Sequence, residues 1–282
     1  MLTRRGQVRL LGPDDLEGFL ALTGRDPVLN VFAEYRARIT YLEPRWLGGE
    51  VWGRFRGSEL VAGCHMGANL VPVECTPDDV LAFTEQALAR VRSTATIVGP
   101  HQPVEAFWQA VSDRWGSPRE ARWRQPHLVI DGPPRVAPDP RVRVTTRADV
   151  EAVYPACVAM YTEEVGVSPE VGGGKDLYRA RVEQLVLRGW SFARFDDEGQ
   201  VEFKAEVACA TPYAAQVQGV YVRPDLRNQG VATAGMAAVV ELVRAKVAPV
   251  VSLYVNDWNE PARAAYARVG FTETARMSTL MF

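Results

Sequence analysis

The sequence has little lysine, histidine and cysteine, and it has no long apolar run. Only three of its 32 lysine and arginine residues are lysines, and it holds three histidines and four cysteines. The cysteines are widely spaced, without a Cys-x-x-Cys pair or nearby paired histidines, which argues against a zinc site or a disulfide framework. No apolar stretch approaches the roughly 20 residues that span a bilayer, and the first ten residues lack a signal-peptide core. We therefore expect a soluble cytoplasmic protein without a metal.

The charge of the chain is nearly balanced. A formal charge of −2 over 282 residues gives no broad electrostatic reason to expect nucleic acid or an anionic membrane as a partner. Hydrophobic residues make up 47% and charged residues 23% of the chain, which is typical of soluble globular proteins. The length of 282 residues can hold one large domain or two smaller ones. The three histidines (His65, His101, His127) are scattered, so we expect none of them in a metal site or a catalytic triad.

A proline-rich segment divides the chain. Residues 131–140 hold four prolines and a glycine, which excludes a helix or central strand and predicts a linker. After it, the residue pattern predicts strands at 142–145, 190–196, 201–210, 214–222, 250–255 and 271–281, and helices at 147–161, 177–188, 230–246 and 259–268. Before it, strands are predicted at 50–56, 59–66, 68–74, 95–98 and 120–130, and helices at 77–91 and 104–112. The repeated order predicts two tandem domains, 1–130 and 141–282.

The most informative stretch is the strand 217–222 with the turn and helix start that follow it. The first N–H groups of a helix lack partners within the helix, and the helix dipole is positive there, so this position suits a diphosphate. Gly230 lets the backbone approach an anion closely, Ala232 is nearly as small, and Arg227 adds a planar cation. The turn alone is equally compatible with an ordinary helix start.

The corresponding turn of the first half lacks these features. Pro72 and Pro77 remove N–H donors, and Glu74 would repel a diphosphate. We therefore expect the first half to be a degenerate copy with a structural or substrate-shaping role.

Two patterns resemble the GNAT superfamily of N-acetyltransferases. The first is Arg-x-x-Gly-x-Ala, formed by Arg227, Gly230 and Ala232. The second, Asn-x-x-Ala-x-x-x-Tyr-x-x-x-Gly-Phe, is formed by Asn259, Ala262, Tyr266, Gly270 and Phe271. The resemblance implies a mixed α/β fold of two tandem GNAT-like domains, each a mostly antiparallel sheet flanked by helices. It also implies transfer of an acetyl group from acetyl-CoA to a primary amine of a small molecule or protein.

The resemblance assigns the cosubstrate site to the second half. The turn would bind the diphosphate, and the edge of strand 217–222 would pair with the pantetheine amides where that strand diverges from the next. The cofactor-binding residues it implies are Val220, Tyr221, Val222, Arg227, Asn228, Gln229, Gly230, Val231, Ala232, Thr233, Asn256, Asn259 and Tyr266. Asn256 is equally compatible with a cap at the strand end.

Of the two catalytic groups, the resemblance assigns the general acid but leaves the general base open. The resemblance makes Tyr266 the general acid that protonates the leaving thiolate, against the alternative of a tyrosine packed in the core. Many family members place a glutamate base where this chain has Gln216. Glu206 is a substitute base, against the alternative that it pairs with Lys204 or faces solvent.

The acceptor groove is expected near the end of helix 147–161. Tyr161, Glu163 and Glu164 are the candidate acceptor contacts, with packing as the alternative for Tyr161, and the two glutamates are also candidate bases through water. The absence of a base at Gln216 supports a second hypothesis, an acyl-CoA-binding regulatory or scaffold protein with weak or no turnover. The sequence leaves the acceptor amine, the acyl length and the choice between monomer and homodimer open.

Overall fold

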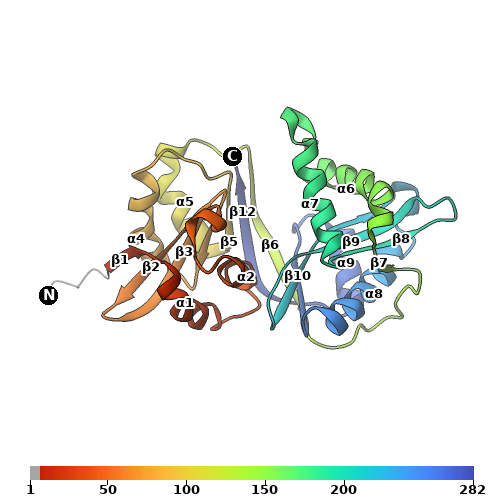
Figure 1. Ribbon diagram of the computed structural model, residues 1–282, viewed down its shortest axis with the longest axis horizontal. Helices are drawn as coiled ribbons and strands as arrows, with labels where there is room; N and C mark the ends of the chain where they lie inside the picture. The colour runs from red at the N-terminus through yellow and green to blue at the C-terminus, as the bar shows by residue number, and fades with distance from the viewer. Residues whose placement is uncertain (1–6) are drawn as a thin grey trace. The chain divides into compact units, whose positions relative to one another are not determined.

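The structure, a computed structural model, describes residues 7–282 of the chain. By packing, the chain forms two compact units (Figure 1). Unit 1 comprises the residues up to His127 together with Glu273–Phe282, and unit 2 comprises Leu128–Thr272. Among the described residues, no helix is both long and apolar enough to cross a bilayer.

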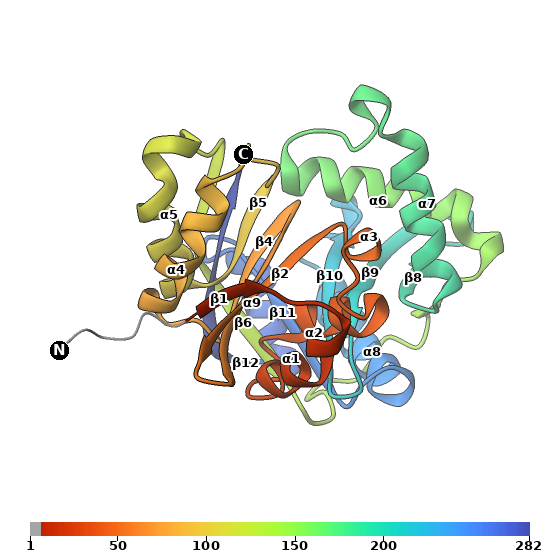
Figure 2. The same ribbon diagram turned by 60° about the vertical axis from the view of Figure 1, so that its left-hand side comes forward.

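Unit 1 is a mixed sheet with helices on both faces (Figure 2). Its strands follow the order β1 (Gln7–Leu10), β2 (Gly49–Arg56), β3 (Glu59–Gly67), β4 (Asn69–Val73), β5 (Thr96–Pro100), β12 (Thr272–Met281) and β6 (Glu120–Ile130), of which the last three residues of β6 and the first of β12 belong to unit 2. Its helices are α1 (Leu16–Thr23), α2 (Val31–Thr40), α3 (Pro44–Leu47), α4 (Pro77–Leu88) and α5 (His101–Trp115). Successive side chains of a strand point to opposite faces, so each face of the sheet has its own core. Ala62 and Cys64 pack under α4 and α5, whereas Val51 and Val73 pack under α1 and α2.

Unit 2 has the same layered plan around its own core. Its strands run β11 (Val250–Tyr254), β10 (Ala214–Val222), β9 (Val201–Ala210), β8 (Ser191–Phe195) and β7 (Arg143–Val144). Its α-helices are α6 (Val150–Val165), α7 (Lys175–Leu187), α8 (Val231–Lys246) and α9 (Glu260–Val269). Phe203 and Val207 of β9 belong to the core under α8 and α9, whereas Val201 and Ala193 belong to the core under α6 and α7.

The two halves of the sequence repeat one order of elements. Each runs strand, helices, three antiparallel strands, helix, strand, helix, strand, and in each the strand after the third antiparallel one pairs in parallel, β4 with β5 and β10 with β11. The last strand of the second half, β12, pairs antiparallel with β5 inside unit 1. The last strand thus belongs to unit 1, whereas the expected domain 141–282 includes it in the second half. The domain boundaries 1–130 and 141–282 stay a prediction about the two halves of the sequence.

The elements agree with the sequence-based expectation in most of the chain. β9 and β10 have the expected bounds, and α8 begins one residue later than expected. In the first half, α5 is longer than expected at both ends, and α4 ends at Leu88 rather than near 91. The sequence analysis missed β1, α1, α2 and α3. The helices α1 and α2 have only 8 and 10 residues, a length at which helix stability comes from packing rather than from local propensity.

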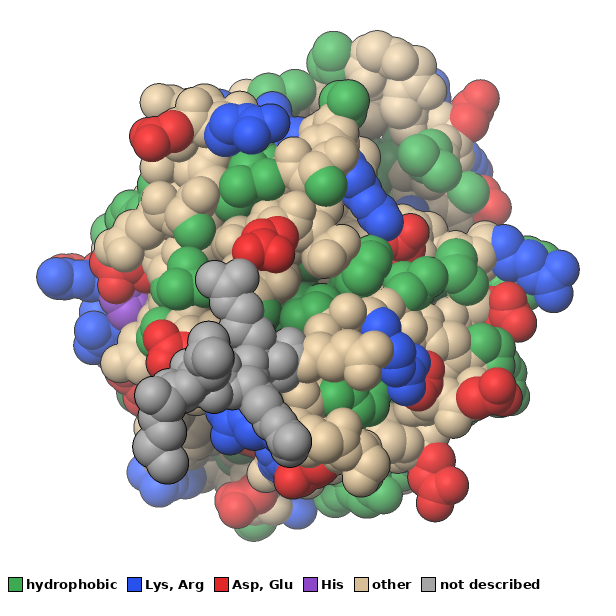
Figure 3. Space-filling view, turned by 90° about the vertical axis from the view of Figure 1, so that its left-hand side faces the viewer, with side chains coloured by type: hydrophobic (Ala, Val, Ile, Leu, Met, Phe, Trp, Pro, Cys, Tyr) green, Lys and Arg blue, Asp and Glu red, His purple; other side chains and the backbone are tan. Residues whose placement is uncertain are grey.

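Charged side chains of both signs are mixed on the face drawn in Figure 3. Blue and red side chains alternate there, with hydrophobic side chains spread between them, and the described residues on this face form no broad area of one sign. This distribution agrees with the formal charge of −2.

Candidate functional site

The turn between β10 and α8 presents a row of backbone N–H groups. After the 3-10 helix η4 (Pro224–Leu226), Asn228 and Gly230 adopt left-handed conformations, with φ of 60° and 80°. α8 begins at Val231, and no side chain caps it. Within the part of the chain that the structure describes, the N–H groups of residues 228–233 donate to no protein acceptor. Successive free N–H groups at the positive end of a helix dipole are an arrangement that binds anions.

The turn is open to solvent. Residues 227–230 are exposed, and no described protein atom lies within 4 Å of the place where a Cβ would stand on Gly230. The left-handed φ of Gly230 favours glycine on conformational grounds. An anion can therefore reach this backbone without displacing a side chain of Gly230.

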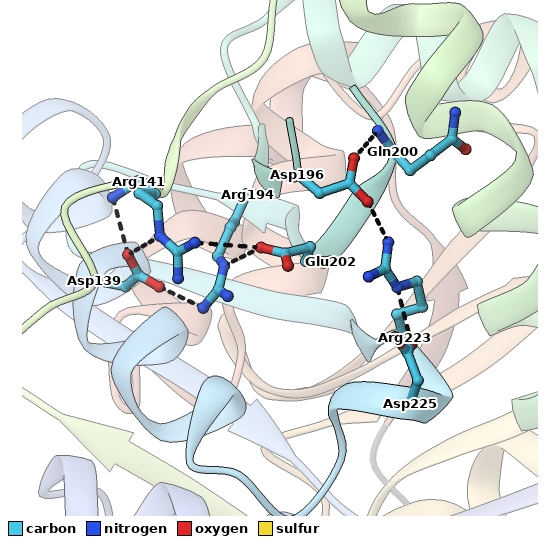
Figure 4. A network of polar contacts seen from close by, with 8 residues as sticks. All are labelled: Asp139, Arg141, Arg194, Asp196, Gln200, Glu202, Arg223 and Asp225. Atoms are coloured by element: carbon cyan, nitrogen blue, oxygen red, sulfur yellow. Dashed lines mark hydrogen bonds and ion pairs between the residues drawn. The ribbon is translucent and has the colours of Figure 1, made fainter. Parts of the chain in front are cut away.

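Arg223 fixes the entry to this turn (Figure 4). Its guanidinium donates to Asp225 in η4 (Nε to Oδ1, 2.9 Å) and to Asp196 in the β8–β9 hairpin (Nη1 to Oδ2, 2.5 Å). The hydrogen bond from Arg223 holds the pKa of the Asp196 carboxyl below its ordinary value. The turn is thus tied to a hairpin of the same sheet rather than left as a loose loop.

A second arginine network anchors the proline-rich segment on unit 2 (Figure 4). Arg194, which is buried, donates to Glu202 and to Asp139 (Nη1 to Oδ2, 2.8 Å). The backbone N–H groups of Arg135 and Asp139 donate to the carbonyls of Val269 (2.8 Å) and Ala234 (3.0 Å). Residues 131–140 therefore lie along α8 and α9 instead of forming a free tether.

β10 diverges from β11 beside the turn. The parallel pairing joins residues 214–216 to residues 250–252, and within the described chain no further pair of these strands is formed. A bulge then interrupts the pairing of β10 with β9 between Gln218 and Tyr221, with Gly219 at a φ of 60°. The divergence expected from the sequence is confirmed, and residues 220–222 lie next to the opening, partly exposed. Their contact with a pantetheine arm stays a prediction.

Glu206 lies against this bulge and is held by two donors. A Cβ on Gly219 would stand 3.0 Å from its Cδ. Its Oε2 accepts from Lys204 Nζ at 2.9 Å, and its Oε1 accepts from Gln218 Nε2 at 2.9 Å. Burial acts to lower the pKa of Lys204, but Glu206, together with the neighbouring Cys157 and Tyr178, raises it above the ordinary value. The ion pair that the sequence analysis gave as the alternative is thus present, on a carboxylate placed beside the bulge.

Tyr266 packs in the core, which is the alternative that the sequence analysis gave for it, and its role as general acid stays a prediction. Its ring belongs to the core under α8 and α9, 5.9 Å from the ring of Phe271 at an interplanar angle of 62°. Its hydroxyl donates to no acceptor among the described residues, and the residue as a whole is 6% exposed. Burial raises the pKa of Tyr266, and the nearby Glu164 charge adds to this effect. The tyrosine is therefore packed in the core, with a protonated hydroxyl left unpaired.

The two asparagines at the end of β11 take different roles. Asn259 caps α9, because its Oδ1 accepts from the N–H of Ala262 at 3.2 Å. Asn256 is buried, and its Nδ2 donates to Glu164 Oε1 at 3.3 Å. The side chain of Asn256 therefore contacts α6.

The last turn of α6 brings the expected acceptor residues to the expected cofactor residues. Glu163 accepts two hydrogen bonds from Arg227, at 2.9 and 2.7 Å, and Glu164 accepts the bond from Asn256. Tyr161 packs at the edge of the Tyr178 ring, with centroids 5.3 Å apart. The packing alternative for Tyr161 is thus present, and the sequence analysis did not anticipate the Glu163–Arg227 pair.

Three further polar residues of this region escaped the sequence analysis as parts of a site. Lys204 is almost fully buried, and its Nζ lies 3.3 Å from Cys157 Sγ. The Tyr178 hydroxyl donates to the Cys157 carbonyl at 3.0 Å. The helical spacing of Tyr154, Cys157 and Tyr161 on α6 is a signal that could have pointed to one face. No group of histidine, cysteine, aspartate and glutamate side chains among residues 7–282 could hold a metal ion.

Two family models match parts of the chain. The Acetyltransferase (GNAT) family matches residues 187–271, which hold β8 to β11, the turn and α9. A Domain of unknown function (DUF4081) matches residues 49–153. No curated protein matches the sequence.

Solved GNAT structures match nearly the whole chain in fold at low sequence identity. A GCN5-related N-acetyltransferase from Sphaerobacter thermophilus is 17% identical, with a TM-score of 0.63 over 100% of this chain and 97% of that one. A GNAT-family acetyltransferase from Colwellia psychrerythraea is 13% identical, with a TM-score of 0.60 over 98% and 99%. A tandem GNAT protein of the clavulanic acid biosynthesis pathway is 15% identical, with a TM-score of 0.57 over 98% of each chain. The chain therefore has the tandem GNAT fold, with a match to the GNAT family over residues 187–271. The first half matches a different family model, which is consistent with the degenerate copy expected from the sequence.

Proposed function

We propose that this protein is an N-acetyltransferase that transfers an acetyl group from acetyl-CoA to a primary amine of an unidentified acceptor. The observation that carries the proposal is the row of free N–H groups at residues 228–233, next to the opening between β10 and β11. A diphosphate fits this row because the donors point from a helix head without a side-chain cap. The match of residues 187–271 to the GNAT family supports acyl transfer by the same unit.

The proposed cosubstrate site extends from the turn along β10. Residues 228–233 would bind the diphosphate, and the backbone of residues 220–222 would pair with the pantetheine amides as an added strand would. Asn256 and Asn259 lie at the end of β11, on the other side of the opening. Acetyl-CoA supplies the thioester that the amine attacks.

Tyr266 is the proposed general acid. As the amine nitrogen bonds to the acetyl carbon, the carbon–sulfur bond breaks and the leaving thiolate takes a proton. The unpaired Tyr266 hydroxyl can donate that proton, and its raised pKa keeps it protonated at neutral pH. Its position in the core fixes the ring, so the hydroxyl is held in one place.

Glu206 is the proposed acceptor of the amine proton, directly or through water. It replaces the carboxylate that the family often has at the position of Gln216. Lys204 and Gln218 each occupy one of its oxygens, which fixes the carboxylate beside the bulge and leaves lone pairs for a proton.

A second function is favoured by the same residues. A carboxylate already engaged by Lys204, together with Gln216 in place of a base, suits a protein that binds acyl-CoA as a regulator or scaffold and turns over weakly or not at all.

A thiol-release assay with acetyl-CoA and a panel of primary amines separates the two functions. We expect amine-dependent release of CoA thiol, together with saturable acetyl-CoA binding by calorimetry. Binding without release on any amine would favour the regulatory protein, and the absence of binding would overturn both.

A further inference from the structure

The C-terminal end of α6 carries two successive glutamates, and each accepts a hydrogen bond from a proposed cofactor-binding residue. Glu163 pairs with Arg227 and Glu164 with Asn256. Arg227 also donates from Nε to the carbonyl of Val222 at 3.1 Å. Three of the five N–H bonds of its guanidinium are therefore directed at protein acceptors rather than at an incoming anion.

The bidentate geometry of this pair matters for a diphosphate. A guanidinium binds a carboxylate or a phosphate through the same fork of two N–H groups. Glu163 occupies that fork with both of its oxygens, at 2.9 and 2.7 Å. A diphosphate at residues 228–233 that recruits Arg227 must therefore replace Glu163.

The exchange is energetically accessible. The side chains of Arg227 and Glu163 are 39% and 58% exposed, and ion pairs exposed to this degree contribute little to stability because water screens them. A diphosphate carries more charge than the carboxylate it displaces, and the free N–H groups of the turn add to its binding. The pair therefore weakens cofactor binding by a small factor without blocking it.

We propose that Glu163 sets the affinity of the proposed cofactor site by competing with the CoA diphosphate for Arg227. The inference rests on the proposed function, because it takes residues 228–233 as the diphosphate site.

The test compares ligands with and without a diphosphate. Calorimetry gives the Kd of CoA, and an NMR titration gives the Kd of pantetheine, which lacks the diphosphate. We expect Glu163→Gln to tighten the Kd of CoA about three- to fivefold and to leave that of pantetheine unchanged.

Two controls isolate the mechanism. Glu151→Gln removes a glutamate at the other end of α6, which pairs with the partly exposed Arg179 of α7, and should leave both Kd values unchanged. In an Arg227→Gln background, Glu163→Gln should change the Kd of CoA by less than about twofold, because the site of competition is gone. A gain of the full size in that background would indicate general charge repulsion and overturn the competition.

The outcomes separate this inference from the proposed function. Wild-type protein that fails to bind CoA refutes the cofactor site itself. Wild-type protein that binds CoA, with a Glu163→Gln variant that binds it no more tightly, refutes only the competition.

Discussion

The N-termini of α4 and α8 occupy equivalent positions in the two halves of the chain. They differ in whether their backbone N–H groups are hydrogen-bonded to protein acceptors. At α4, Thr76 Oγ1 accepts from the N–H of Asp79, Asp79 Oδ2 accepts from the N–H of Thr76, and Pro77 has no N–H. At α8, the N–H groups of residues 228–233 have no protein acceptor within the described chain. Glu74, just before the head of α4, adds a negative charge there.

The difference shows how one fold separates stability from binding. A capping box satisfies the free N–H groups of a helix and stabilises it, so the head of α4 has little left to offer an anion. The N-terminus of α8 lacks that stabilisation, and its backbone N–H groups stay available to an anion. The repeat of elements sets the architecture, and we propose that a few residues at the N-terminus of one helix decide which half can bind CoA.

Loss of the Tyr266 hydroxyl should have the largest effect. Counted back from the helix-ending glycines Gly116 and Gly270, Ser112 stands in the first half where Tyr266 stands in the second. We expect Tyr266→Phe to lower kcat about hundredfold, with the Kd of acetyl-CoA nearly unchanged, because the ring still packs against Phe271. Ser112→Ala should change neither quantity. An equal loss of binding and turnover in Tyr266→Phe would refute the role of general acid.

Acid should destabilise unit 1 before unit 2, because the buried histidines His65 and His127 both lie in unit 1. Burial lowers the pKa of His127 to about 4 and also lowers that of His65. A histidine held neutral in the fold loses stability as the pH falls below its unfolded pKa of about 6.5, and the loss is complete near the folded value.

Between pH 7 and pH 5, His127 alone should cost about 2 kcal/mol of unfolding free energy. Hydrogen exchange at the two pH values would assign the loss to a unit, and a His127→Gln variant should lose less stability than the wild type over the same range. Equal acid sensitivity of both units would contradict the expectation.

A new carboxylate at the head of α8 should make it resemble the head of α4. Thr233 lies in the first turn of α8, three residues after Gly230, where an aspartate can accept N–H groups of the turn. We expect Thr233→Asp to stabilise the protein slightly and to weaken the Kd of CoA at least about tenfold. The uncharged Thr233→Asn is the matched control and should retain most of the affinity. Stronger CoA binding in Thr233→Asp would contradict an anion site at this turn.

Removal of the cap at α4 should have the smallest effect. Thr76→Ala deletes the hydroxyl that accepts the Asp79 N–H, so we expect a loss of about 1 kcal/mol in unfolding free energy by urea denaturation. The Kd of CoA should stay unchanged, since the freed donor lies in the half for which we propose no CoA site. A change in that Kd would show that the first half also takes part in cofactor binding.

The parts that the sequence predicted are those with strong local signals. The bounds of β9 and β10 follow from apolar runs and turn residues, and the start of α8 follows from Gly230 and the small residues after it. The uncapped N-terminus of α8 could be predicted because the residues that form it lie within one short segment, residues 227–233.

The contacts that the sequence did not predict join distant segments. Glu163 and Arg227 are 64 residues apart, and no local pattern states that the end of α6 lies beside the turn. β12 pairs with β5, which lies most of the chain's length away in the sequence. A strand pattern alone cannot predict which strand it pairs with. Lys204 looked like one half of an ordinary ion pair until its burial and its contact with Cys157 were known.

Hydrogen exchange of the full chain with and without CoA tests the central claim most directly. The account predicts that CoA slows exchange of the N–H groups of residues 228–233, and that the head of α4, residues 76–80, is unaffected. Protection at the head of α4, or saturable CoA binding that leaves residues 228–233 unprotected, would contradict it.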